Sequence, residues 1–338
     1  MASNRAAVLH GIHDLRIEDV PAPQPDPDQV LVEISAVGIC GSDVHYYEHG
    51  RIGEYVVEAP MILGHESGGT VIAVGSAVGH LALGQRVALE PGVPCRRCEQ
   101  CRAGRYNLCP DVRFFATPPV DGSLAQQVVI DADFAFAVPD SLSDAGAALI
   151  EPLSVGIWAC RKAGVTTGSR VLVTGAGPIG VLAGLVARAS GAAHVAVTDI
   201  NADRLEQALA LGIDQAVPAG SDLADVGADV LLECTGIEPV AGAGITALRP
   251  AGRAVLVGMG ANATMTLPVQ TIQNRELTVT GTFRYANTYP AAIALAASGR
   301  IPLDALVGAR VPLERAEDAL RMGRTDPAVL KTVVEVRG

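Results

Sequence analysis

Four cysteines lie close together in the segment PCRRCEQCRAGRYNLC, separated by two, two and seven residues. They are Cys95, Cys98, Cys101 and Cys109. Four thiolates on one short loop can complete a tetrahedral shell around zinc, and that closed shell leaves no position for a substrate. Independent cysteines seldom fall at ligand spacing, and iron–sulfur clusters use other spacings. The pattern therefore predicts a structural zinc site rather than free or redox-active thiols.

A second group of possible metal ligands is dispersed along the chain. Cys40 lies in GICGSDVHYYEHG, His65 and Glu66 lie in GHESGG, and Glu151 lies in ALIEPLSVG. A cysteine, a histidine and a carboxylate can bind zinc and leave the fourth position for water or substrate, as metal catalysis requires. However, a cysteine beside glycine is more often a small core residue, and a His–Glu pair more often lies at the surface. The spacing alone leaves both interpretations open.

A glycine-rich turn, GAGPIG, follows an apolar strand pattern at residues 171–174 and opens a helical pattern. Glycine permits the tight turn and the free N–H groups of a helix N-terminus attract a pyrophosphate, so Gly175, Gly177 and Gly180 are candidate cofactor contacts. A second strand ends at Asp199, at about the spacing of the acid that binds the adenosine ribose. An acid there would repel a 2′-phosphate. The pattern therefore favours NAD over NADP. The simpler alternative is that the three glycines only cap a helix and that Asp199 is an ordinary loop residue.

The surrounding sequence changes character near residue 151. Before it, short β-type runs at 30–38, 68–75 and 85–91 are separated by glycine and proline. After it, apolar strands alternate with Ala/Leu-rich helices, and the strands are expected at 170–175, 194–199, 229–236, 253–258 and 276–281. Such alternation predicts βαβ units on a parallel sheet. Beyond residue 281 the pattern is irregular, and composition does not establish where the last fifty or so residues belong.

Composition limits the class of protein. The chain has 338 residues, 49% hydrophobic and 18% charged, with a formal net charge of −11. These values predict two domains and exclude disorder, and the negative charge argues against binding nucleic acid. Glycines and a proline interrupt the longest apolar run, between residues 170 and 188, so we expect no membrane span. The N-terminal MASNRAAVLHGIHD lacks the apolar core of a signal peptide, so we expect a cytoplasmic protein. In the reducing cytoplasm, clustered cysteines are typical of metal binding rather than of disulfide bonds.

Several longer strings resemble one family. GICGSDVHYY, GHESGG, the clustered cysteines, ALIEPLSVG and GAGPIG together resemble the zinc-containing medium-chain dehydrogenase/reductase superfamily. RYNLCPDVRFFATPPVDGSL, ALIEPLSVGIWACRKAGV and GTFRYANTYP are similar to its sorbitol (L-iditol) and xylitol dehydrogenase branch. The likeness runs from about Val8 to the end of the chain. Animal sorbitol dehydrogenases resemble the chain but lack the clustered cysteines, which are intact here as in bacterial relatives.

The resemblance implies an α/β fold in two domains. A β-rich, GroES-like catalytic domain would comprise residues 1–150 and 285–338, and a Rossmann doubly wound parallel sheet at 151–284 would be inserted in it and bind NAD. The active site would lie in the cleft between them, at the carboxyl ends of the parallel strands. The resemblance also implies one catalytic and one structural zinc per subunit and a homo-oligomer, a dimer or a tetramer.

The resemblance further assigns roles residue by residue. Cys40, His65 and Glu66 would be the catalytic zinc ligands, with Glu151 bonding the metal-bound water or joining the metal. Ser42 and His45 would relay the alcohol proton outward, and Asp43 would orient the ligand histidine. Substrate contacts would come from Tyr46, Glu151, Arg284 and Tyr285. Beside the three glycines, the cofactor contacts would be Ile179, Asp199, Arg204, Val257, Gly258, Met259, Thr282 and Phe283.

These residue types suit alcohol oxidation. Zinc stabilises an alkoxide, which can transfer hydride to C4 of the nicotinamide. Glu66, in place of a second cysteine, makes a harder site, and the forked donors of Arg284 can bind several hydroxyls. We therefore expect reversible oxidation of a sugar alcohol (sorbitol, xylitol or L-iditol) to the ketose with NAD. L-threonine or a vicinal diol is the alternative substrate, and a zinc-ribbon binding module on an idle scaffold is a third hypothesis. Cys160 and Cys234 are expected in the core.

Overall fold

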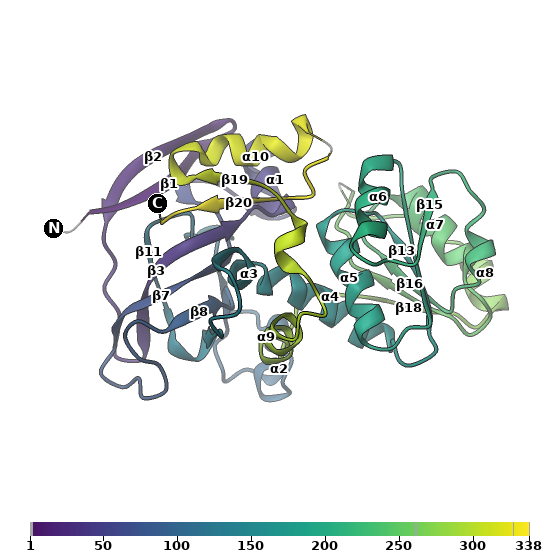
Figure 1. Cartoon of the computed structure of the whole chain (residues 1–338), viewed down its shortest axis with the longest axis horizontal. Helices are drawn as coiled ribbons and strands as arrows, with labels where there is room; N and C mark the ends of the chain where they lie inside the picture. The colour runs from purple at the N-terminus through teal and green to yellow at the C-terminus, as the bar shows by residue number, and fades with distance from the viewer. Residues whose placement is uncertain (1–2, 261, 327, 338) are drawn as a thin grey trace. The chain divides into compact units, whose positions relative to one another are not determined.

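The chain divides into two units in the computed structural model, which describes residues 3–260, 262–326 and 328–337 (Figure 1). Unit 1 contains the residues up to Glu151, together with Tyr289–Gly299 and the residues from Leu303 onward. Unit 2 contains Pro152–Thr288 and Arg300–Pro302. Residues 285–288 therefore lie with the preceding residues in unit 2.

Unit 1 is built on a sheet whose pairs are antiparallel except for the last one. In the order of pairing, its strands are β12 (Ala135–Ala137), β8 (Arg86–Leu89), β7 (Glu66–Val74), β3 (Gln29–Gly38), β20 (Lys331–Glu335) and β19 (Val307–Pro312), and β11 (Gln127–Asp131) also pairs with β3. A second sheet has the order β2 (Asp14–Pro21), β1 (Ser3–Gly11) and β6 (Met61–Ile62). The core of the unit includes Val32, Ile34 and Leu63, all fully buried.

The C-terminal strand β20 completes the main sheet of unit 1. It pairs in parallel with β19 and antiparallel with β3, so that Val333 lies opposite Gly38 and Val334 opposite Val37. Figure 1 shows yellow β20 beside purple β3. Helix α10 (Ala316–Thr325) contacts β20 and β19. The side chains of β20 are buried from Lys331 to Val334. This burial accounts for the apolar residues Val333 and Val334 in the strand.

The remaining elements of unit 1 are short. Helix α1 (Gly41–His49) directly follows β3, and α3 (Asp144–Ala148) packs on β3 and β7. The cysteine segment forms α2 (Glu99–Arg102) and the 3₁₀ turn η1 (Tyr106–Leu108). The small strand pairs are β4 (Arg51–Ile52) with β5 (Tyr55–Val56), and β9 (Gly92–Val93) with β10 (Arg113–Phe114). Helix α9 (Tyr289–Ala297) also belongs to this unit.

Unit 2 is a parallel sheet with helices on both faces. Its strand order is β15 (Gln215–Pro218), β14 (His194–Asp199), β13 (Arg170–Thr174), β16 (Val230–Glu233), β17 (Arg253–Leu256) and β18 (Thr278–Gly281). Figure 1 shows α5 (Pro178–Ala189) and α6 (Ala202–Ala210) on one side of this sheet and α7 (Glu238–Ala247) and α8 (Val269–Asn274) on the other. This arrangement confirms the predicted doubly wound parallel sheet.

Some strands end earlier than their sequence patterns. The apolar run at 229–236 leaves the sheet after Glu233, because the backbone turns at Gly236, where φ is +67°. The run at 253–258 likewise ends at Leu256. Helix α4 (Ile150–Ala163) begins in unit 1 and continues in unit 2. Among the residues that the structure describes, no helix is long and apolar enough to span a lipid bilayer.

Candidate functional site

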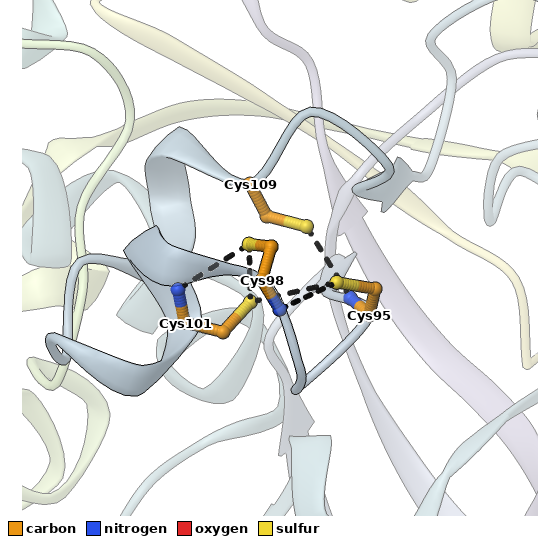
Figure 2. Close-up of side chains that lie close together, drawn as sticks. All are labelled: Cys95, Cys98, Cys101 and Cys109. Carbon is orange, nitrogen blue, oxygen red and sulfur yellow. Dashed lines mark hydrogen bonds between the residues drawn. The ribbon is translucent and has the colours of Figure 1, made fainter.

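The four clustered cysteines converge on one point in unit 1. Figure 2 shows their sulfur atoms pointing toward one another from the loop that contains α2 and η1, and all four lie within 4.8 Å of one another. The sulfur of Cys98 lies 3.4 Å from that of Cys101, and the Cys95 and Cys101 sulfurs are 3.9 Å apart. Zinc–sulfur bonds of ~2.3 Å in a tetrahedron place the sulfurs ~3.8 Å apart, so the four sulfurs are arranged as a zinc ion requires to within small shifts.

Backbone amides support this sulfur cluster. The N–H groups of Cys98 and Cys101 donate to the sulfurs of Cys95 and Cys98, each at 3.4 Å. Donation from the Arg97 and Cys98 amides lowers the pKa of Cys95 to about 7, whereas burial and the neighbouring Cys98 thiol raise the pKa of Cys101 to about 12. The Cys95 thiolate thus forms readily, whereas Cys101 needs a cation beside it to lose its proton, as expected of a metal-binding loop.

The dispersed candidates Cys40, His65 and Glu66 also converge in unit 1. Their ligand atoms lie within 4.8 Å of one another, although they come from three places: the start of α1, the loop before β7 and the first residue of β7. His65 is 7% and Glu66 1% exposed, so a surface His–Glu pair is the wrong interpretation. Both oxygens of the Glu66 carboxylate lie close to the Lys331 ammonium, Oε1 at 2.6 Å and Oε2 at 2.5 Å from its Nζ. Thiolate, imidazole and carboxylate ligand atoms that converge in this way are a donor set that fits a zinc ion.

Asp43 lies directly behind His65. Its carboxylate is fully buried, accepts from the Cys40 and Gly64 amides at 3.0 and 2.9 Å, and lies 3.7 Å from His65 Nδ1. Burial lowers the pKa of His65, but the Asp43 carboxylate and the Cys40 thiolate outweigh burial and hold that pKa well above its usual value. The negative charges of Asp43 and Cys40 therefore favour a positive charge beside His65, which a metal cation would supply.

Buried charges surround this group. Glu151, at the start of α4, is 5% exposed, and Lys331, at the start of β20, is 4% exposed. Burial lowers the pKa of Lys331, but the carboxylate of Glu66, the thiolate of Cys40 and the carboxylate of Glu151 together raise it above its usual value. Glu151 thus acts on Lys331, which contacts Glu66, and its carboxylate is not among the three converging ligand atoms.

Helix α1 presents the other candidates of unit 1. Cys40 is its N-cap residue, Ser42 is half-buried, His45 is exposed and Tyr46 is buried. The helix thus has one face that reaches solvent at His45 and one that is buried at Tyr46. Tyr47 fixes this helix to α10: its hydroxyl donates to Glu317 at 2.5 Å and accepts from Arg321 Nε at 2.9 Å.

In unit 2 the glycine-rich turn joins β13 to α5. Gly175 has φ +90°, and a β-carbon at Gly180 would overlap the Gly175 carbonyl oxygen, so both positions require glycine. Apart from its chain neighbours and the backbone of α5, no described atom lies within 4 Å of where a β-carbon of Gly177 would be. Together with the free N–H groups at the start of α5, this open space fits a pyrophosphate.

Asp199 lies against the same turn. Its carboxylate accepts from the Ala176 amide at 2.6 Å and from the Asn201 amide at 2.8 Å. Arg204, in the first turn of α6, has a buried Nε without a hydrogen-bond partner. An acid and an unsatisfied guanidinium donor at the end of β14 fit the adenosine end of a dinucleotide.

The other candidate cofactor residues follow β17 and β18. Val257 and Gly258 both donate their amides to the carbonyl oxygen of Glu233, and Met259 is 72% exposed. Thr282 donates its amide to Leu256 at 3.0 Å. The Arg284 guanidinium lies 4.8 Å from the centre of the Phe283 ring, and Tyr285 is buried. The candidate substrate residues are thus divided: Tyr46 and Glu151 belong to unit 1, and Arg284 and Tyr285 to unit 2.

Sequence reasoning did not single out Lys331, Glu90 or Glu233. All three are buried charged residues next to apolar runs. Lys331 begins β20, Glu233 ends β16, and Glu90 directly follows β8. That placement is the one available signal, because a charged residue at a core position is uncommon unless it has a partner. Cys160, predicted in the core, is buried, whereas Cys234 is half-buried.

Comparison with known proteins extends these observations. Residues 26–140 match the alcohol dehydrogenase GroES-like domain, and residues 178–298 match the zinc-binding dehydrogenase family. The sorbitol dehydrogenase of Macaca fascicularis is 49% identical over 327 residues, covering 94% of this chain and 91% of that protein. The Bos taurus sorbitol dehydrogenase is 47% identical over 332 residues, covering 95% and 93%. The crystal structure of L-idonate 5-dehydrogenase from Escherichia coli superposes with a TM-score of 0.93 at 31% identity, covering 99% of both chains.

Proposed function

Because the chain belongs to the sorbitol dehydrogenase branch of the zinc-containing medium-chain dehydrogenases, we propose that it oxidises a sugar alcohol reversibly to the ketose and transfers the hydride to NAD. The observation that carries the proposal is the convergence of Cys40, His65 and Glu66, whose ligand atoms lie within 4.8 Å of one another. Sorbitol, xylitol and L-iditol are the candidate substrates. An oxygen ligand at Glu66 suits a polar substrate with many hydroxyl groups.

Two zinc ions per subunit complete the proposal. Cys95, Cys98, Cys101 and Cys109 would hold a structural ion, and Cys40, His65 and Glu66 a catalytic one. When bound, the catalytic zinc stabilises the alkoxide form of the alcohol and NAD accepts its hydride. The catalytic domain would comprise residues 1–150 and 285–338, and the NAD domain residues 151–284.

This chain's own residues would handle the proton and the substrate. Ser42 would accept the alcohol proton and pass it to His45, whose exposed ring can release it to water. Asp43 keeps His65 oriented through its buried carboxylate. Tyr46, Glu151, Arg284 and Tyr285 would contact the polyol, and Asp199 would accept from the adenosine ribose and disfavour the 2′-phosphate of NADP.

We also propose that the protein is a cytoplasmic homo-oligomer, a dimer or a tetramer. The support is the family membership and, for the compartment, the seven free cysteines among the described residues. Light scattering coupled to size-exclusion chromatography measures the number of subunits, and a monomer would contradict the proposal.

A substrate screen tests the function. Formation of NADH or NADPH is measured with sorbitol, xylitol, L-iditol, L-threonine and butanediol. We expect turnover of at least one polyol with NAD and a much lower rate with NADP. Turnover of threonine or butanediol and of no polyol would reject the polyol proposal and leave a related zinc dehydrogenase.

The variant Cys40→Ser tests the role of the open site. Losing a ligand should abolish turnover while NADH still binds with wild-type affinity, because Cys40 and the glycine-rich turn lie in different units. Cys160→Ser is the control for loss of a thiol, since Cys160 lies outside both cysteine sites; assayed below the melting transition of unit 2, it should keep its turnover. Full activity of Cys40→Ser would contradict the assignment.

A further inference from the structure

Two histidines lie one helical turn apart on the exposed face of α1. His45 and His49 are the first and last residues of the segment HYYEH, and both side chains are exposed. Residues four positions apart are neighbours on a helix surface, and the centres of these two rings are 5.6 Å apart. Tyr46 and Tyr47, which separate them in the sequence, are buried on the other face. The two imidazoles therefore form a pair that solvent and ions can reach.

The separation of the two rings fits a tetrahedral zinc ion. Zinc–nitrogen bonds of ~2.1 Å at tetrahedral angles place the centres of two coordinated imidazole rings ~5.2 Å apart, close to the observed 5.6 Å. The right angle of a square-planar ion would bring the centres to ~4.5 Å, which needs a larger movement. Two histidines four residues apart on one helix face are also a common way for a helix to hold zinc. Water would occupy the remaining positions of the ion.

The charges around the pair favour a cation. His49 is the last residue of α1, where the helix dipole places partial negative charge. The Glu48 carboxylate lies 3.9 Å from His49 Nε2. Arg51, the lysine or arginine nearest in the sequence, donates its guanidinium to the Gly53 carbonyl oxygen at 3.1 and 2.6 Å. The net charge of −11 adds a general attraction for cations.

We propose that His45 and His49 form an additional, solvent-exposed metal site that binds Zn²⁺ when zinc is in excess, and that the bound ion stops proton transfer through His45. An imidazole relay takes up a proton on one ring nitrogen and releases a proton from the other, and a metal ion occupies the lone pair of one of them. Binding of the ion needs only the two histidines. The inhibition rests on the proposed function, in which His45 carries the alcohol proton.

Calorimetric titration of the zinc-loaded protein with Zn²⁺ tests the site, at about pH 7.5 because metal binding requires neutral imidazole. We expect one further ion per subunit. His49→Gln and His45→Gln should each weaken its binding by about tenfold or more, because one of two ligands on the same helix face is lost. His194→Gln is the matched control: it removes an imidazole of unit 2 that bonds Gln215, and it should leave the further ion in place.

Polyol oxidation at increasing concentrations of added Zn²⁺ tests the effect on the proton. Wild-type turnover should fall as the site fills, with half inhibition at the Kd that the titration gives. His49→Gln should oxidise the polyol at the wild-type rate without added zinc, and should need about tenfold more zinc for half inhibition. His194→Gln should be inhibited as the wild type is. The substituted histidine of α1 is exposed, so the fold should keep its stability.

The two measurements separate the possible failures. A titration without a further ion, or with an ion whose binding His49→Gln leaves unchanged, would overturn the site. Binding that His49→Gln weakens, together with polyol turnover that zinc does not inhibit, would support the site and overturn its effect on the proton. A protein that binds the ion through both histidines but oxidises no polyol would contradict the proposed function alone.

Discussion

Glu90 shows at the scale of one residue how burial changes a side chain. It directly follows β8, is 2% exposed, and accepts a hydrogen bond of 2.7 Å from the Tyr106 hydroxyl in the cysteine loop. Burial raises the pKa of Glu90 to about 7 against the opposing effect of that hydrogen bond, and the Glu151 carboxylate raises it further. Glu90 thus interacts with both the cysteine loop and Glu151, and its charge depends on pH in the neutral range.

The stability of the protein should therefore vary with pH through Glu90. An unfolded carboxyl titrates near 4.5 and the folded one near 7, so between these values the folded protein binds the extra proton and loses stability as pH rises. Glu90→Gln has no such proton and keeps an acceptor for Tyr106. Relative to wild type, its free energy of unfolding should rise by on the order of 2–3 kcal/mol between about pH 5 and pH 8.

Urea denaturation at several pH values measures this difference. Glu99→Gln, an exposed acid in α2, is the control and should follow the wild-type curve. Parallel stability curves for Glu90→Gln and wild type would show that Glu90 is ionised across the range.

At the scale of elements, Glu233 joins two loops of unit 2. It is fully buried at the end of β16, and its carboxylate accepts from the Thr235 amide at 2.8 Å and the Gly236 amide at 3.0 Å. Its carbonyl oxygen accepts from Val257 and Gly258, which belong to the candidate cofactor set. Glu233, at the end of β16, thus holds the loop that follows the neighbouring strand β17.

Glu233→Gln should weaken cofactor binding. The amide group replaces one acceptor oxygen by a donor that faces backbone N–H groups, so the loop must shift at a cost of about 1–3 kcal/mol, or roughly 5- to 150-fold in the Kd of NADH. NADH fluorescence titration measures the Kd, with exposed Glu238→Gln as the control. An unchanged Kd would mean that these loops do not contact the cofactor.

Tyr47 has the corresponding role between α1 and α10. Removing its hydroxyl in Tyr47→Phe leaves Arg321 and Glu317 without their shared partner. We expect a loss of ~1–3 kcal/mol in the free energy of unfolding, measured by urea denaturation. Tyr55→Phe changes an exposed hydroxyl and should cost little. If both variants lose equally little, the contact between the helices does not stabilise α1.

At the scale of the whole molecule, the two units should respond differently to metal. Both candidate zinc sites lie in unit 1, where metal-binding energy adds to folding energy. Zinc removal by a chelator, or Cys101→Ser for the four-cysteine site alone, should lower the melting transition of unit 1 and leave that of unit 2 in place. Differential scanning calorimetry resolves the transitions.

The reciprocal variant is Cys160→Ser. It places a hydroxyl in the core of unit 2 and should lower the other transition. A single transition that both variants lower equally would show that the units melt together and would contradict this prediction.

The sequence by itself determined the features whose parts are close neighbours in the chain. The four-cysteine loop and the strand–turn–helix of residues 170–189 could be predicted because spacing and local backbone preference suffice to form them. The alternation of strands and helices predicted the parallel sheet. The predicted strand ends were less accurate: the strand predicted at 229–236 ends at Glu233. The dispersed metal ligands were recognised through family resemblance, because their spacing carries little information.

Only the tertiary structure decided which distant residues meet. Strand register places β20 against β3 and thereby brings Lys331 to Glu66, and the turn into α1 brings Cys40 to His65. Glu90, Glu151 and Glu233 acquire their environments through burial, which depends on the packing of elements far apart in the chain. The physical reason is that backbone preference acts over a few residues, whereas charge, hydrogen bonding and metal affinity depend on distances that only the assembled core sets.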